Sequence, residues 1–450
     1  MSESLLTEDE GVKALVAYVN SGSAIGPVGK GKGVGYSLMK SSPTSFSWST
    51  AIEDFEGSDT PVDRYLIKID RRTKEFITPE PIVLSERELV DAVLAATGQH
   101  LSSWTRFTDG SMSISYKVAV KEDPDVAYVV QIRHYGSVAS MDAFMTVISR
   151  TISPSVLPIP PVYPIPGELV HQSTTGMGRQ IARYMPGQVV LPIYAGLSHE
   201  ERLIFVRKLA LAFSACWEIQ LPEPRLVGEL IASNIDGHIT LRVGPDRHNG
   251  LGGPFHSVRD YLRAYIKRCL VLLEKQQGIE EYKEKYLHRI RIFVETRLHE
   301  IPAIVETVPI IAMHADMGPH NIIVSNQTPT EIQAIIDWEF LESAPYASLH
   351  REMDMFFREN APNGFGPEYE RADELREAFW SSIPNWKRWN ESEATQTFLE
   401  WFRFGLFMQP EYRPKELADE ERDSFWAENI RVVEGMLDKY SPQLNEAINA

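Results

Sequence analysis

One segment, residues 309–340, limits the possible folds more than any other part of the chain. It reads PIIAMHADMGPHNIIVSNQTPTEIQAIIDWEF. An apolar run at 322–324 precedes a turn that contains a proline, and apolar residues then alternate at 332–336, a pattern that predicts a β-hairpin. Because a hairpin returns the chain, Asn321 before its first strand and Asp337 at the end of its second strand are expected to meet at one site.

The polar residues of this segment have the spacing H-x-D-x-x-x-x-N, formed by His314, Asp316 and Asn321. The amide oxygen of Asn321 and the carboxylate of Asp337 are hard ligands of the kind that Mg²⁺ takes while it also holds phosphates and waters. Asp316 is positioned to orient an acceptor hydroxyl or accept its proton, and His314 is expected to fix the loop by hydrogen bonds. The layout favours phosphoryl transfer, which needs positioning and charge neutralisation more than covalent chemistry.

Two other interpretations of the segment stay open. It is compatible with a polar loop between core strands that carries incidental acids. It is also compatible with a transition-metal site at His314, Asp316 and His320, although no outlying fourth ligand is evident.

The charge of the chain limits its partners. Of 450 residues, 45 are Lys or Arg and 62 are Asp or Glu, which gives a formal net charge of −17. Such acidity argues against a nucleic-acid binder, which would show a basic stripe, and against binding to anionic membranes. It does not exclude one nucleotide, because a nucleotide site needs only local positive groups.

Several simple features favour a cytoplasmic protein. No apolar stretch of membrane-spanning length is present, and the acidic first residues lack the basic region of a secretory signal. The two cysteines, Cys216 and Cys269, cannot form a disulfide framework. The oligomeric state is not indicated.

The predicted secondary structure changes along the chain. Residues 1–83 are predicted to be an N-terminal extension, in which the glycine-rich stretch 21–35 is interpreted as a flexible loop because it lacks a phosphate-loop pattern. Residues 84–186 carry strand patterns, and residues 187–450 are mostly helical with the hairpin embedded. The predicted fold class is therefore α+β, with a small β-rich lobe and a larger helical lobe.

The motifs HADMGPHN and IIDWE resemble those of the aminoglycoside phosphotransferase and choline kinase family, whose fold is similar to that of protein kinases. Weaker echoes occur in the same order, namely LPIPPV (157–162), ARYMPG (182–187), VGEL (227–230) and GGPF (252–255). The resemblance covers about residues 84–440. It implies a bilobal kinase-like fold, ATP or another nucleoside triphosphate with Mg²⁺, Asp316 as catalytic base, and Asn321 and Asp337 as metal ligands.

The resemblance also implies where the nucleotide binds. ARYMPG would be the hinge, where backbone groups of Arg183, Tyr184 and Met185 meet adenine. The stretch FTDGSMSISYKV would cover the phosphates, with backbone and hydroxyl donors at Gly110 and Ser111. An ordinary hairpin is the alternative interpretation of that stretch.

The phosphate-binding cation of kinase-like folds is less clear in this sequence. VVQIR (129–133) stands where the third strand is expected, and either Gln131 or Arg133 takes the place of the lysine. The two side chains share one face of a strand. Arg133 is preferred because it alone carries charge, with Asp142 as its expected partner.

The acceptor is expected to bind the helical part near Asp316. Acidic residues are frequent over 352–377 and tryptophans follow, a combination that suits a cationic amine, although solvated acidic helix faces over a Trp-rich core are the favoured explanation. Glu352 and Asp354 are the predicted substrate contacts.

The sequence thus predicts a kinase that phosphorylates a hydroxyl of a small molecule, with an amine-bearing acceptor as the sharper hypothesis. The alternative is a nucleotide-binding pseudokinase that acts as a scaffold, which the single glycine near the phosphates and the uncertain cation favour.

Overall fold

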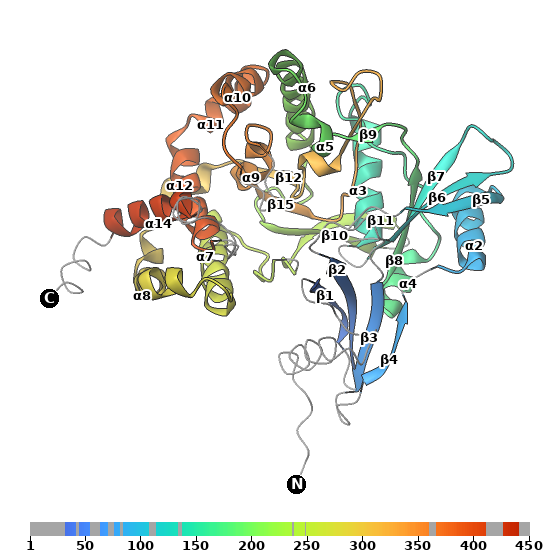
Figure 1. Ribbon diagram of the computed structural model, residues 1–450, viewed down its shortest axis with the longest axis horizontal. Coiled ribbons are helices and arrows are strands. Elements are labelled where there is room, and N and C mark those ends of the chain that lie inside the picture. Colours follow the sequence, from blue (N-terminus) through green and yellow to red (C-terminus); the bar gives the residue numbers. More distant parts are fainter. Residues whose placement is uncertain are drawn as a thin grey trace, which may run out of the picture. The chain divides into compact units, whose positions relative to one another are not determined.

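The computed structural model of the chain divides into two compact units (Figure 1). The first contains the chain up to Thr146 together with Pro160–Met185, and the second contains Val147–Ile159 and the chain from Pro186 onward. The structure describes residues 32–41, 45–54, 64–70, 76–81, 84–107, 114–133, 137–235, 238–247, 249–359, 366–410 and 426–440, with backbone only before residue 84 and at 234–239. The three-part division predicted at 83 and 186 stays a prediction.

An antiparallel four-stranded sheet precedes the family-like region, with strands β1 (Lys32–Ser41), β2 (Ser45–Asp54), β3 (Arg64–Asp70) and β4 (Phe76–Pro81) in chain order. The loop prediction for 21–35 is wrong over its last residues, because β1 begins at Lys32. Gly33 and Gly35 alternate there with larger residues, and pairing with β2 supplies the hydrogen bonds that glycine-rich backbone otherwise leaves to water.

The rest of the first unit is built on a second antiparallel sheet, whose strands follow chain order. In β6 the buried positions alternate strictly, so that Ile114, Tyr116 and Val118 form one core with Leu89 and Val93. The elements are α2 (Glu86–Thr97), β5 (Leu101–Arg106), β6 (Ile114–Val120), β7 (Ala127–Arg133), α3 (Val138–Thr151, ending in the second unit), α4 (Glu168–Thr175) and β8 (Gly178–Arg183).

The second unit is mostly helical. Helices α7, α8, α12 and α14 pack as one group, and α10 packs on α6 (Figure 1). The helices are α5 (Leu191–Tyr194), α6 (His199–Trp217), α7 (Val258–Lys275), α8 (Glu280–Arg297), α9 (His350–Asp354), α10 (Ala372–Ser381), α11 (Pro384–Asn390), α12 (Glu393–Phe407) and α14 (Ala427–Tyr440), with short 3-10 turns at Leu298–Glu300, Ala303–Thr307, Pro319–Asn321 and Tyr346–Leu349. None of the helices in the described ranges is long and apolar enough to cross a membrane.

Two small sheets of this unit position the polar segment 314–337. One has the order β11-β10-β15-β12 and the other the order β14-β13-β9. The predicted hairpin is present as β13 and β14, whereas β10, β11 and β15 were not predicted. The strands are β9 (Gln188–Val189), β10 (Gly228–Ile235), β11 (His238–Gly244), β12 (Ile310–His314), β13 (Ile322–Val324), β14 (Ile332–Ile335) and β15 (Leu341–Pro345). The α+β class predicted from the sequence is confirmed.

Candidate active site

The polar segment forms a tight loop between β12 and β13, which we call the catalytic loop (314–321). Residues 311–313 of β12 are buried, and a 3-10 turn over Pro319–Asn321 leads directly into β13. Gly318 is required there, because a Cβ atom at this position would lie 2.6 Å from the ring of His320. The loop therefore holds its side chains at fixed positions against a packed sheet.

His314 is fully buried and anchors the loop. Its Nδ1 accepts the N–H of Asp316 at 3.3 Å, and its Nε2 lies 3.0 Å from the carbonyl oxygen of Ile336. Together these contacts require the neutral imidazole with its proton on Nε2. Burial lowers the pKa of His314 and outweighs the nearby acidic charges, so the ring stays neutral. His314 ties the start of the loop to the end of the hairpin.

Asp316 is the carboxylate of the loop, and its side chain keeps 35% of its surface exposed. His320 Nε2 lies 3.0 Å from Oδ1, and the Asn321 amide donates to Oδ2 at 3.0 Å and to the Asp316 carbonyl at 2.9 Å. Burial alone would raise the pKa of Asp316, but the hydrogen bond and charge of His320 outweigh it and hold the pKa below the ordinary value. The carboxylate is therefore ionised at neutral pH.

Asp337 follows β14 in a backbone conformation that few non-glycine residues adopt, with φ of 65°. Such strain persists only where the surroundings enforce it. The next residue, Trp338, is buried, donates from Nε1 to the Ile335 carbonyl at 2.9 Å, and packs on His314 with ring centroids 4.7 Å apart. The charge of Asp337 raises the pKa of His320, so the carboxylate lies near the catalytic loop.

The oxygen atoms at this site suit a hard cation. Both N–H groups of the Asn321 amide point at Asp316, which orients the amide oxygen away from that residue. An amide oxygen and the Asp337 carboxylate fit Mg²⁺, which needs only one or two protein ligands when phosphates supply others. The transition-metal interpretation fits poorly because both ring nitrogens of His314 are occupied, and no group of three or more His, Cys, Asp or Glu in the described ranges is placed to hold a metal.

The two predicted substrate contacts, both on α9, have different surroundings. Glu352 is half-buried near the catalytic loop, where burial, with a further contribution from the charge of Asp316, raises its pKa to about 7. Asp354 is 6% exposed and bound by two arginines, by Arg358 through Nε and by Arg376 at 3.0 Å. Glu352 thus belongs to the catalytic region, whereas Asp354 is neutralised by cations of the chain itself.

In the first unit, the residues predicted to replace the kinase lysine belong to a buried polar cluster. Arg133 is only 1% exposed, and its Nη2 donates to Gln131 at 2.8 Å and to Gln180 at 3.0 Å. Gln180 in turn donates to Asp142 at 2.9 Å. Burial raises the pKa of Asp142 to about 6 against the opposing effects of Gln180 and Arg133. We call Gln131, Arg133, Asp142 and Gln180 the β7–α3–β8 cluster.

The other predicted nucleotide contacts are partly described. Gly110 and Ser111 lie outside the described residues. At the predicted hinge, the N–H groups of Arg183 and Tyr184 donate to the carbonyls of Pro161 and Ala127 at 2.8 and 2.9 Å. The Met185 N–H has no acceptor among the described residues, which leaves it available to a ligand.

Sequence reasoning missed two residues of these sites. His320 was considered only as a metal ligand, yet it is a hydrogen-bond partner of Asp316. Its position four residues after Asp316 is a spacing from which this contact could have been predicted. Gln180 binds both Arg133 and Asp142 from β8, and no short-range pattern marks it.

A family model described as the phosphotransferase enzyme family, APH, matches residues 104–379, well over half of the chain. The protein therefore belongs to this family, and the predicted resemblance, with the kinase-like fold that it implies, is confirmed. No curated protein matches significantly.

Solved structures with similar folds are distant in sequence. The streptomycin and ATP complex of APH(2'')-IIa is 14% identical, with 78% of this chain and 97% of that chain covered and a TM-score of 0.43. The GDP and kanamycin complex of APH(2'')-IIia is 10% identical, with 78% and 98% covered and a TM-score of 0.43. Macrolide 2'-phosphotransferase type I is 12% identical, with 79% and 98% covered and a TM-score of 0.40.

Proposed function

We propose that this member of the phosphotransferase family transfers the γ-phosphate of ATP, with Mg²⁺, to a hydroxyl of a small molecule. The observation that carries the proposal is the geometry of Asp316. An ionised and partly exposed carboxylate is held on one oxygen by His320 and on the other by Asn321. Such fixed orientation is what a proton acceptor or orienting group in phosphoryl transfer requires.

In the proposed reaction, Asp316 orients the acceptor hydroxyl and accepts its proton as the oxygen attacks phosphorus. Asn321 and Asp337 would hold Mg²⁺, which when bound neutralises phosphate charge. His314 keeps the loop and the end of the hairpin in register, so that these oxygens stay at fixed positions. Glu352, close to Asp316, is the proposed contact of an amine on the acceptor, since a carboxylate favours a nearby cation.

On the nucleotide side, the Met185 N–H is the proposed donor to the base. Gln131 is the more accessible member of the β7–α3–β8 cluster, and Arg133 supports it through the bond to its amide oxygen. Positive charge for the phosphates would then come chiefly from Mg²⁺.

A nucleotide-binding pseudokinase is the second candidate function, and one observation favours it. The buried guanidinium of Arg133 is bound by two glutamines, so it replaces the phosphate-binding lysine poorly. Against this candidate, Asp316, Asn321 and Asp337 are all present around one loop.

Two measurements on the full chain separate the candidates. Transfer of labelled phosphate from ATP is assayed over a panel of alcohols and amino alcohols, and the melting temperature is measured with Mg–ATP and with ATP plus EDTA. A phosphotransferase labels at least one acceptor and is stabilised more by Mg–ATP. Stabilisation without transfer to any acceptor supports the scaffold, and absence of both effects contradicts nucleotide binding.

A further inference from the structure

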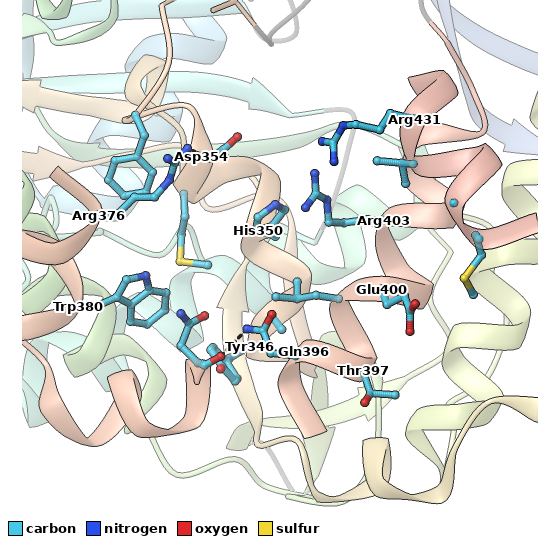
Figure 2. A pocket seen from close by; sticks show the side chains of 18 residues that line it. Tyr346, His350, Asp354, Arg376, Trp380, Gln396, Thr397, Glu400, Arg403 and Arg431 are labelled. Carbon is cyan, nitrogen blue, oxygen red and sulfur yellow. Dashed lines mark hydrogen bonds and ion pairs between the residues drawn. The ribbon is translucent and has the colours of Figure 1, made fainter. Parts of the chain in front are cut away.

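A cavity of about 730 Å³ lies in the second unit, among α9, α10, α12 and α14 (Figure 2). Among the described residues that line it, none belongs to the catalytic loop or to the end of the hairpin. The short helix α9 separates the two regions. Burial, and further the charge of Asp316, raises the pKa of Glu352, which places this side chain near the catalytic loop. His350, Met353 and Asp354 line the cavity. The cavity is therefore a feature distinct from the candidate active site.

Apolar residues, some of them aromatic, line a large part of the cavity, which we call the apolar wall. A small molecule with an aromatic or aliphatic body would bury its apolar surface against these residues. Such burial is the main source of affinity in pockets of this size. The residues that form the wall are Ala347, Met353, Phe357, Trp380, Leu399, Val432 and Met436.

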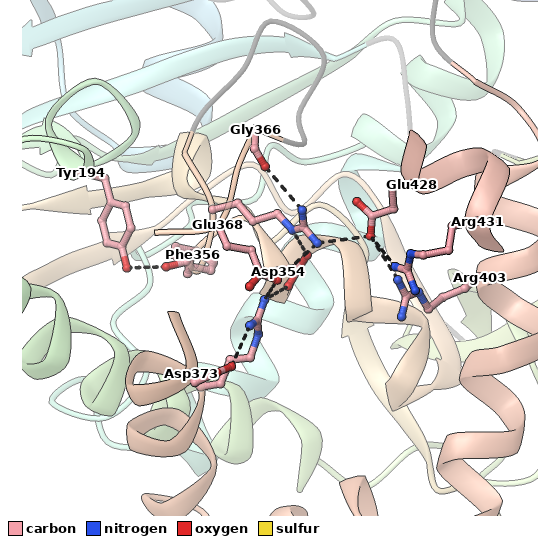
Figure 3. A network of polar contacts seen from close by, with 11 residues as sticks. Tyr194, Asp354, Phe356, Gly366, Glu368, Asp373, Arg403, Glu428 and Arg431 are labelled. Carbon is pink, nitrogen blue, oxygen red and sulfur yellow. Dashed lines mark hydrogen bonds and ion pairs between the residues drawn. The ribbon is translucent and has the colours of Figure 1, made fainter. Parts of the chain in front are cut away.

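One end of the cavity, on α12 and α14, also carries arginines. Figure 2 shows the side chains of Arg403 and Arg431 pointing toward one another beside His350. Both arginines share a single carboxylate oxygen of Glu428, at 3.2 and 3.8 Å, and Arg358 reaches the same oxygen at 3.3 Å (Figure 3). Three guanidinium groups thus meet one carboxylate.

One donor at this end is unused. The Nε of Arg403 is buried and has no hydrogen-bond partner within the described part of the chain. A buried donor without a partner costs free energy that a bound acceptor would recover. Burial lowers the pKa of Arg403; among the nearby charges Glu428 opposes this shift most strongly, and Arg431 adds to it.

The carboxylates that line the cavity are already neutralised. Asp354 binds Arg358 and Arg376. Glu400 accepts from Lys439 at 2.6 and 2.8 Å and from the Tyr440 hydroxyl at 3.4 Å. A cationic ligand would therefore have to compete with cations of the chain, whereas an anion meets Arg403 and Arg431, which share one carboxylate oxygen of Glu428.

We propose that this cavity is a second binding site, for a small amphipathic organic anion. The body of the ligand lies on the apolar wall, and its carboxylate, sulfonate or phosphate lies between Arg403, Arg431 and His350. Charge-assisted bonds from guanidinium groups are the strongest contacts available for such an anion.

The test uses a substitution that narrows the cavity without harming the fold. Gly435 lines the cavity on α14, and an added Cβ atom would meet nothing within 4 Å. Because Gly435 is an exposed residue at the edge of the cavity lining, a leucine there is expected to narrow the cavity, and it also favours the helix, since glycine is a poor helix former. Gly435→Ala is the matched control, since it gives the same helix effect and leaves the cavity open.

The probes are anilinonaphthalene sulfonate, an aromatic anion, and phenylnaphthylamine, which has the same aromatic body without the charge. Binding to the full chain is followed by fluorescence titration. Gly435→Leu is expected to weaken binding of both probes by about ten-fold or more, and Gly435→Ala by less than about two-fold. Arg403→Met is expected to lower the affinity for the anionic probe about ten-fold and to change the affinity for the neutral probe little.

The melting temperature of each variant is first compared with that of the unmodified chain, so that a change in affinity is interpreted only for folded protein. Unchanged affinity for the anion in Gly435→Leu would show that the probe does not occupy the cavity and would overturn the proposal. Equal loss of both probes in Arg403→Met would overturn the anionic part. If Arg403→Met fails to fold, Arg431→Gln, at a side chain that is 71% exposed, replaces it with the same expected ratio between the probes.

Discussion

The catalytic loop and the β7–α3–β8 cluster treat a charged side chain in opposite ways. Asp316 keeps a third of its side-chain surface exposed and is held from two sides by neighbours that stabilise its charge. Arg133 is 1% exposed, and its guanidinium donates to Gln131 and to Gln180, of which Gln180 donates on to Asp142. The comparison indicates that a charged side chain can bind a ligand only where the chain orients it and also leaves it accessible. Arg133 is thus better suited to positioning than to binding phosphate.

The largest effect is expected at the catalytic loop. Asp316→Asn keeps the size of the side chain but removes the proton acceptor, so kcat should fall about 1,000-fold. The Kd for Mg–ATP should change by less than about three-fold, because Asp316 is proposed to face the acceptor. Steady-state kinetics and a binding titration check both values, and an equal loss in Kd would assign Asp316 to the nucleotide instead.

A second effect separates the metal from the acceptor. Asp337→Asn removes a negative ligand of Mg²⁺, so the Kd for Mg–ATP should rise at least about ten-fold. The Kd for ATP in EDTA should stay the same and serves as the control. Equal affinities of both proteins for Mg–ATP would place the metal elsewhere.

The third prediction concerns the enclosed charge. Arg133→Met leaves Gln180 and Asp142 with fewer buried partners, so the free energy of unfolding should fall by about 3 kcal/mol. KM for ATP should rise less than about three-fold, because Arg133 is proposed to position Gln131 and not to bind phosphate. Urea unfolding and kinetics measure the two effects. A large rise in KM with unchanged stability would make Arg133 the phosphate ligand.

The last effect concerns a buried carboxyl group that, unlike Asp316, lies among other acidic side chains. Burial, with further contributions from Asp246, Glu229 and Glu352, raises the pKa of Glu342 to about 8. At a pH between the ordinary pKa of glutamate and about 8, Glu342 is protonated in the folded state and ionised in the unfolded state. The free energy of unfolding therefore falls as the pH rises through this range. The loss should reach about 2 kcal/mol between about pH 6 and pH 8 and should shrink in Glu342→Gln. Urea unfolding at the two pH values checks this, and equal slopes in both proteins would contradict it.

The catalytic loop could be predicted because its residues are close in sequence. His314, Asp316 and Asn321 fall within eight positions, and a single hairpin brings Asp337 back to them. The tautomer of His314 and the positive φ of Asp337 could not be predicted, since they depend on the Ile336 carbonyl and on the packing of Trp338.

The β7–α3–β8 cluster and the cavity were beyond sequence reasoning for a different reason. Gln180 lies 47 positions from Arg133, and only the pairing of β7 with β8 brings them together. The prediction of Asp354 as a cation contact took no account of Arg358 and Arg376, which follow it on the chain and bind it in the fold. Helix packing also creates the cavity, and no local pattern marks a residue such as Gly435.

Phosphate transfer by the unmodified full chain tests the central claim most directly. The protein is incubated with Mg²⁺ and ATP labelled on the γ-phosphate, together with the panel of alcohols and amino alcohols, and the products are separated by size and charge. The account predicts label on a small molecule as a phosphate ester, and none with Asp316→Asn. Label that stays in ATP with every acceptor, or that appears equally with Asp316→Asn, would contradict it.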